Sequence, residues 1–257
     1  MNQIVYFPIK SLIDLFEGIG KYFLLMIKIF RSYRTWSIYF SFIIDQMYLI
    51  GTNSIPIVFF TSMFSGMVSS INAAYQLETG LVPTWYIGGI VGEAILLELA
   101  PMITGLVMTG RIGATITAEI GTMRVSEQID ALEMLSFDPV SFLIMPRIFA
   151  AAIMFPVLVV IADFFGIIGG LIAAINSIDV SVYEFLRGLK GWYRPWDAWF
   201  GVIKGFFFGI AITSIACYKG YYTSGGAHGV GKATTSTVVI SCIVIILLDF
   251  LLGGLLL

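Results

Sequence analysis

Long apolar stretches separated by short polar ones constrain this chain more than any other feature of its sequence. Of its 257 residues, 58% are hydrophobic and only 12% are charged, with a mean hydropathy of +0.95. Soluble domains carry about 25% charged residues, so a chain this apolar needs lipid as its solvent. Because the apolar runs have the length of membrane-crossing helices, the sequence predicts an all-α integral membrane protein.

The rest of the composition excludes several function classes. The formal net charge of −2 gives no reason to expect a nucleic-acid partner. Nearly all of the chain is needed for spans and connections, which leaves no room for a separate soluble catalytic domain. Cys217 and Cys242 lie in or beside apolar runs, as small buried residues do, so neither a disulfide framework nor a metal site is expected. The N-terminus does not have the pattern of a cleaved signal peptide.

Five spans are predicted, preceded by an amphipathic segment. In residues 11–34, charged residues recur at helical spacing along one stripe, which is too charged for a straight span. A helix lying in the membrane interface is therefore expected, with an imperfect first span as the alternative. Residues 1–45 would form this interfacial segment and residues 46–257 a five-span domain. The spans are expected at about residues 52–74, 85–110, 146–174, 198–217 and 236–257.

The placement of Lys and Arg predicts the orientation in the membrane. With the N-terminus in the cytoplasm and the C-terminus in the periplasm, the N-terminal segment and the connections at 111–146 and 219–232 lie on the cytoplasmic side, and that side holds most of the Lys and Arg residues. The connection at 176–197 is then outside, where its aromatic residues suit an interfacial belt with a short amphipathic helix. The outer cations are Arg187, Lys190, Arg194 and, in the outer part of the fourth span, Lys204.

Residues of about 125–135 are expected to form a short helix outside the bilayer, between the second and third spans. Ser126 is a suitable N-cap, and Glu127 would lie in the first turn, where the helix dipole favours an anion. Apolar residues share one face, and Glu127, Asp130 and Glu133 lie away from it. A solvated loop helix and a helix that binds a partner both fit this pattern.

Glu98 is the sharpest candidate functional residue, because it lies within the second span, three residues before Pro101. A carboxylate in a span is costly, and such groups usually face a cavity, a partner or a proton path. Pro101 removes the helical donor from the carbonyl near residue 97 and can kink the helix. The other acids in or near spans are expected to be paired or interfacial: Glu93, Glu119, Asp163 and Asp249.

One stretch imitates a nucleotide-binding motif. Gly226–Ala233 nearly matches the phosphate loop GxxxxGK[ST] but lacks its final hydroxyl, and it joins two spans instead of following a strand in a soluble domain. Nucleotide binding is therefore not expected. His228 is the only histidine, so neither a metal site nor a cofactor is predicted. No Ser-His-Asp set can be assembled in one place, which weakens a hydrolase interpretation.

The stretch from Glu98 to Arg147 resembles the MlaE (YrbE) family of permeases, the membrane subunits of MCE-type ABC lipid transporters. The likeness covers nearly the whole chain after about residue 45, and Glu-Gln-Ile-Asp-Ala-Leu in this setting is a specific signal. Its pieces are Glu98–Pro101, Gly110–Gly113, Ala118–Met123, Val125–Leu132, Asp138–Pro139 and Pro146–Arg147, with Phe64 and Gly66–Val68 upstream and Gly231–Thr235 and Leu248–Phe250 downstream.

The resemblance implies a fold, an activity and partners. The family forms a homodimer in the bacterial inner membrane, in which an interfacial helix precedes five spans. Its helix between spans two and three is a coupling helix on a cytosolic ABC ATPase, which supplies the ATP hydrolysis. Here that helix includes Glu127, Gln128, Asp130, Ala131, Leu132 and Glu133.

The resemblance also implies a site. The dimer encloses a phospholipid cavity, open toward the periplasm beneath MCE-domain proteins, and the function would be lipid transport between the inner and outer membranes for outer-membrane homeostasis. The cavity residues implied here are Glu98, Leu97, Pro101, Phe64 and Met67. Many members have Arg where this chain has Leu97, so an Arg–Glu pair does not carry over and the most obvious neighbouring cation is missing.

Two functions from other classes are alternatives to a permease. A membrane-embedded lipid-modifying enzyme would use Glu98 as acid or base, but it needs a second catalytic group that the sequence does not offer. A scaffold that only anchors partners gains nothing from an acid and a proline in the middle of a span. A permease without ATPase activity of its own is therefore the favoured interpretation.

Overall fold

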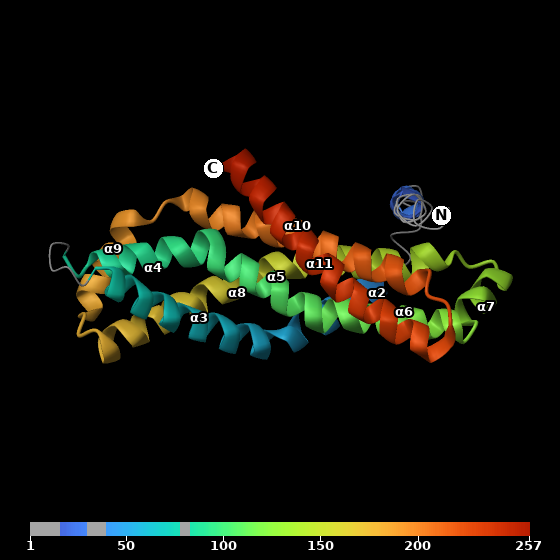
Figure 1. Ribbon diagram of the computed structural model, residues 1–257, viewed down its shortest axis with the longest axis horizontal. Coiled ribbons are helices and arrows are strands. Elements are labelled where there is room, and N and C mark those ends of the chain that lie inside the picture. The colour runs from blue at the N-terminus through green and yellow to red at the C-terminus, as the bar shows by residue number, and fades with distance from the viewer. Residues whose placement is uncertain (1–15, 30–39, 78–82) are drawn as a thin grey trace, which may run out of the picture.

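The computed structural model describes residues 16–29, 40–77 and 83–257, and every regular element in these ranges is helical. The all-α membrane fold is thereby confirmed, since five segments are long and apolar enough to cross a membrane. The first four spans run along the long axis of the molecule, and the fifth, Gly226–Leu256, runs obliquely across it (Figure 1). They are Phe40–Gln76, Tyr86–Val125, Val140–Ser177, Pro195–Tyr221 and Gly226–Leu256.

Several spans are composite. The first joins two helices through a 3-10 turn at Thr52–Ser54, and the second contains π-helical turns at Ile95–Leu99 and Thr109–Gly113. A third π-helical turn, Val140–Ile144, opens the third span. The helices are α2 (Phe40–Ile50), α3 (Ile55–Gln76), α4 (Tyr86–Ala94), α5 (Ala100–Met108), α6 (Ala114–Val125), α7 (Gln128–Met134), α8 (Met145–Ser177), α9 (Val182–Trp192), α10 (Pro195–Tyr221) and α11 (Gly226–Leu256).

The helices continue well beyond the apolar runs that identify them. The first span begins at Phe40, and the second continues through Arg111 to Val125, which the sequence assigned to a connection. Hydropathy identifies only the part of a helix that is apolar enough to lie in the bilayer. The helix itself continues beyond that part where its polar side chains form hydrogen bonds or ion pairs with other residues. Arg111 donates a hydrogen bond to the Ser54 hydroxyl, and the Arg147 guanidinium lies 2.9 Å from the Glu119 carboxylate.

The expectation of a Gly-rich loop over residues 219–232 is wrong. Helix α10 continues to Tyr221 and α11 begins at Gly226, so the glycines and His228 lie in the first turns of a helix. The chain turns at Gly225 and Gly226, whose φ angles of 93° and 67° suit glycine because it has no Cβ. Glycine is only a weak helix breaker when neighbouring helices hold the segment, as they do here.

The described part of the N-terminal segment, residues 16–29, is helical, and the remainder of that segment up to residue 39 lies outside the described ranges. This helix is seen end-on in Figure 1, so it crosses the long axis of the bundle. Tyr22 shares a 2.8 Å hydrogen bond with Ser214 of α10, and Lys28 lies 3.1 Å from Asp138. The helix thus contacts the bundle through Tyr22, Lys28 and the buried Leu25 and Ile29, and most of its other large apolar side chains remain exposed.

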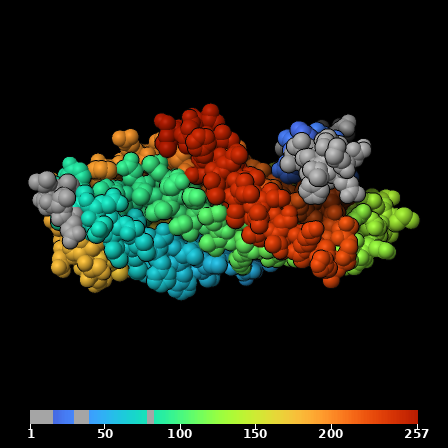
Figure 2. All heavy atoms as spheres, viewed as in Figure 1, coloured from blue at the N-terminus to red at the C-terminus, as the bar shows by residue number. Residues whose placement is uncertain are grey.

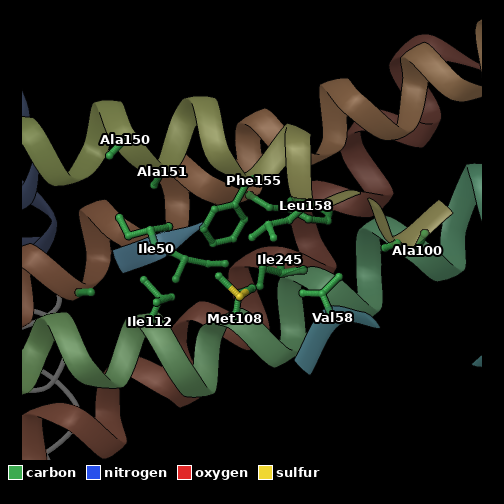
Figure 3. Packing of buried hydrophobic residues seen from close by; sticks show 14 of the residues in the cluster. Ile50, Val58, Ala100, Met108, Ile112, Ala150, Ala151, Phe155, Leu158 and Ile245 are labelled. Atoms are coloured by element: carbon green, nitrogen blue, oxygen red, sulfur yellow. The ribbon is translucent and has the colours of Figure 1, made fainter. Parts of the chain in front are cut away.

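The core forms where the spans cross. Figure 3 shows Phe155 of α8, Met108 of α5 and Ile245 of α11 pointing into one shared space, and all three side chains are fully buried. The least buried spans are the first and the fifth. In Figure 2 the red surface of α11 lies along the outside of the bundle, and the last turns of the helix project from it. Both spans therefore present apolar faces to lipid or to another protein.

Candidate functional site

A cluster of three charged side chains lies between the second, fourth and fifth spans. The Lys204 ammonium donates a 2.7 Å hydrogen bond to Glu98 Oε2 and lies 2.7 Å from Asp249 Oδ1. The contact between Lys204 and Asp249 is an ion pair without hydrogen-bond geometry. The Lys204 side chain is only 2% exposed and that of Asp249 12%, whereas that of Glu98 is 48% exposed. Glu98 is thus the open side of the cluster.

Local chemistry explains why the second span carries this site. Pro101 has no N–H to offer the Leu97 carbonyl, which would otherwise lack a donor in the middle of a span. The Lys204 ammonium donates to that carbonyl at 2.9 Å. The preceding π-helical turn, which contains Glu98, widens the helix, as such turns often do at functional sites. The proline therefore creates an acceptor that the buried lysine satisfies.

The cluster contains two acids and one base, so its formal charge is −1 when both carboxyl groups are ionised. The ammonium also lies 4.6 Å from the centre of the Phe200 ring, within cation–π range. Ion pairing and hydrogen bonding offset the high cost of burying a charge in a span. Leu97 does remove the most obvious neighbouring cation of Glu98, but Lys204 supplies another one from a different helix.

The remaining acids of the spans differ in their surroundings. Asp249 and Glu119 are paired, as expected, with Lys204 and Arg147. Asp163 is buried, and its Oδ1 accepts no hydrogen bond from any residue in the described ranges. The expectation of a paired or interfacial group is therefore wrong for Asp163, which lies well inside α8.

A groove of about 620 Å³ lies between α3 and the second span, a volume typical of ligand sites. Hydroxyl and amide side chains recur along α3 at helical spacing, and aliphatic side chains from α4 and the π-helical turn line the groove as well. None of these lining residues is charged. They are Phe60, Thr61, Phe64, Ser65, Val68, Ser69, Asn72, Ala73 and Gln76 of the first span and Ile90, Ala94 and Leu99 of the second.

The five residues expected around a lipid cavity lie in two places. Phe64 lines the groove, and Met67 is a half-buried neighbour on α3. Glu98, Leu97 and Pro101 lie at the charged cluster and do not line the groove, although Leu99, which does, follows Glu98 in the chain. Sequence reasoning missed Lys204 as a partner of Glu98. A lysine inside an apolar run, in a chain with several intramembrane acids, is the signal that points to it.

Helix α7 lies at the end of the bundle opposite α9 (Figure 1). Ile129 is fully buried and anchors the helix, while Met134 and Leu135 are 86% and 69% exposed. Two polar contacts join α7 to neighbouring helices: Arg124 lies 2.7 Å from Asp130, and the Tyr221 hydroxyl donates a hydrogen bond to Glu133 at 3.2 Å. These contacts connect α7 to α6 and to α10, the helix that carries Lys204.

The expected cap of this helix is wrong. Ser126 does not cap α7, because its hydroxyl donates to the Thr122 carbonyl at 2.7 Å and so belongs to the end of α6. The N-cap position is Glu127, in the left-handed region with φ 59°, and Ser136 after the helix has φ 62°. Such conformations are costly for residues other than glycine, so contacts around α7 must fix its position.

Comparisons with known proteins identify the family to which this chain is similar. The family model described as "Permease MlaE" matches residues 43–255. A "Probable ABC transporter permease protein" of Rickettsia bellii is 39% identical over 243 residues, which cover 95% of this chain and 93% of that protein. The "Intermembrane phospholipid transport system permease protein MlaE" of Haemophilus influenzae is 32% identical over 246 residues, with 95% and 93% covered.

A plant protein is also similar. "Protein TRIGALACTOSYLDIACYLGLYCEROL 1, chloroplastic" of Arabidopsis thaliana is 36% identical over 211 residues, which cover 82% of this chain and 60% of that protein. The names of the bacterial relatives confirm the expectation of a permease subunit and not an enzyme. Given the match over nearly its whole length, the chain belongs to the MlaE permease family.

Proposed function

We propose that this multi-pass inner-membrane permease moves phospholipid in an ATP-driven transporter that links the inner and outer membranes and maintains outer-membrane lipid composition. The observation that carries the proposal is the groove of about 620 Å³ on α3, which has both polar and apolar lining and includes Leu99, the residue that follows Glu98 of the Glu98–Lys204–Asp249 cluster in the chain. A lipid needs both kinds of lining, because its head is polar and its chains are apolar. The membership in a permease family that includes a phospholipid transporter supports the same substrate class.

The assembly proposed here is a homodimer with a cytosolic ATPase and a periplasmic MCE-domain protein. The names of the bacterial relatives, as ABC transporter permeases, support the ATPase partner. The apolar faces of α3 and α11 support a second copy, since the first and fifth spans bury the smallest share of their residues. In such a dimer the groove and the open side of Glu98 would face a common cavity with Leu97, Pro101, Phe64 and Met67.

The proposed orientation has the N-terminus in the cytoplasm and the C-terminus in the periplasm. The α7 end of the bundle would then meet the ATPase, and the α9 end would meet the MCE-domain protein. The distribution of Lys and Arg along the chain supports this orientation. The helix of residues 16–29, which crosses the long axis, would lie in the cytoplasmic interface, ahead of the first span that begins at Phe40.

Filling the groove is expected to block transport. Ser69→Trp adds an indole to the groove, whereas Val157→Trp adds the same group to an exposed position on α8 outside it. We expect Ser69→Trp to lower ATP-dependent phospholipid transfer from proteoliposomes, and the phospholipid that co-purifies, by roughly tenfold, the effect of losing about 1.4 kcal/mol of binding. The control should retain both. Equal transfer by the two variants would show that lipid does not use this groove.

Reversing the charge of α7 is expected to uncouple the ATPase. Glu127→Lys with Asp130→Lys should weaken ATPase binding at least tenfold in a pull-down, because opposed like charges at an interface are costly. The matched control is Asp130→Asn, which breaks the ion pair with Arg124 without adding a cation. If Asp130→Asn is equally defective, Asp130 acts by holding α7 on α6. If both variants bind the ATPase and transport normally, α7 is a solvated loop helix.

A further inference from the structure

Helix α9 lies across the end of the bundle (Figure 1), so its axis crosses the direction of the spans. Two close backbone contacts fix it on α4. A Cβ on Gly188 would lie 1.8 Å from the Trp85 carbonyl oxygen, and one on Gly88 would lie 2.0 Å from that of Phe185. No side chain fits at either glycine without moving a helix. Helix α9 is therefore fixed across the end of the bundle, outside the segments that are long and apolar enough to span a membrane.

The outward face of α9, together with the two residues that follow the helix, combines cations with apolar and aromatic side chains. Arg187, Lys190 and Arg194 are exposed, and none of them forms an ion pair with a residue in the described ranges. Arg187 lies 5.3 Å over the Trp85 ring. The exposed apolar and aromatic residues between these cations are Val182, Tyr183, Leu186 and Tyr193.

The nearest acid on the same helix has another role. Glu184 accepts from the Ser181 backbone at 3.1 Å and completes a capping box at the start of α9. The backbone N–H and the hydroxyl of Ser181 hold the pKa of the Glu184 carboxyl below its usual range. In helical register Glu184 lies away from Tyr183 and Lys190, whereas Arg187, three residues later, is its neighbour on the helix but forms no ion pair with it. Glu184 is thus held by Ser181, and the three cations have no ion-pair partner among the described residues.

We propose that this face of α9 binds the phosphate groups of anionic phospholipids at the membrane surface. A helix in the membrane plane inserts its apolar side chains at the boundary of the acyl chains and directs its cations toward the headgroups. Each Lys or Arg near an anionic surface adds about 1 kcal/mol of attraction, which is roughly fivefold in local lipid concentration. The surface is separate from the groove, and the proposal does not depend on transport.

Tryptophan fluorescence can test the proposal directly, because four tryptophans lie at this end of the bundle. Trp192 is the last residue of α9, Trp85 directly precedes α4, and Trp196 and Trp199 lie in the first turns of α10. The chain has five tryptophans, and Trp36→Phe removes the fifth, which lies outside the described ranges. In this background, brominated phosphatidylglycerol and brominated phosphatidylcholine are compared as quenchers in liposomes. We expect at least a threefold preference for the anionic lipid, weaker in high salt because salt screens exposed charges.

Lys190→Gln with Arg194→Gln should reduce this preference to about one, while Lys219→Gln with Lys232→Gln, at the other end of the bundle, should leave it unchanged. Both pairs are at the surface, so thermal unfolding should not change. Equal quenching by the two lipids in the unchanged background would overturn the proposal. An unaltered preference for the anionic lipid in the Lys190→Gln/Arg194→Gln variant would overturn it as well. This holds even if that variant loses a bound protein partner, because the surface would then bind protein and not lipid.

Discussion

Replacing Lys204 with methionine is expected to destabilise the protein by about 3 to 5 kcal/mol, the usual cost of removing one partner from a buried ion pair. Methionine has nearly the shape of the lysine stem, so the change removes charge and donors and leaves little cavity. Asp249, which is 12% exposed, would then keep a buried charge without a partner. The Leu97 carbonyl would also lose the donor that replaces the missing proline N–H.

Thermal unfolding of the purified protein in detergent measures this effect, and two further variants identify its cause. Glu98→Gln should be mild, because Glu98 is 48% exposed and Asp249 remains to pair with Lys204. Asp249→Asn combined with Lys204→Met should recover much of the loss, because no unpaired charge remains. A Lys204→Met protein as stable as the unchanged one would show that water or a headgroup already solvates the cluster.

The spans were predictable from the sequence because a bilayer imposes a length and an apolar composition on any helix that crosses it. Glu98 was predictable for a related reason, since an acid in such a run is costly wherever it lies. The partner was not. Lys204 and Asp249 are far from Glu98 along the chain, and helical periodicity carries no information on which spans meet. The position of Lys204 near the start of α10 favoured the interpretation as an outer cation.

The errors at the ends of helices have a different origin. Gly226 to Lys232 has the composition of a loop, but the packing of α11 against α6 and α10 holds it in a helix, as tertiary contacts often do against a weak local preference. Ser126 is a residue type that often caps helices, but its hydroxyl donates a hydrogen bond to the Thr122 carbonyl at the end of α6 and does not cap α7. Local propensity does not decide such a competition between two adjacent helix ends.

Gly66→Ala is expected to cost about 3 kcal/mol or more, because α3 and α8 touch at backbone level. A Cβ on Gly66 would lie 1.9 Å from the Gly166 carbonyl oxygen, and one on Gly169 would lie 2.1 Å from that of Met63. Backbone cannot move aside as a flexible side chain can, so the two helices would have to separate. Since α3 carries one wall of the groove, the separation should also lower the phospholipid that co-purifies.

The matched control is Gly253→Ala on α11, where a Cβ would meet nothing within 4 Å. Alanine favours a helix over glycine by about 1 kcal/mol, so this control should unfold at the same temperature as the unchanged protein or slightly above it. The comparison therefore separates helix propensity, which both substitutions improve, from the clash that Gly66→Ala alone creates. If both variants were equally stable, the close contact between α3 and α8 would be wrong, and with it the position of the groove wall.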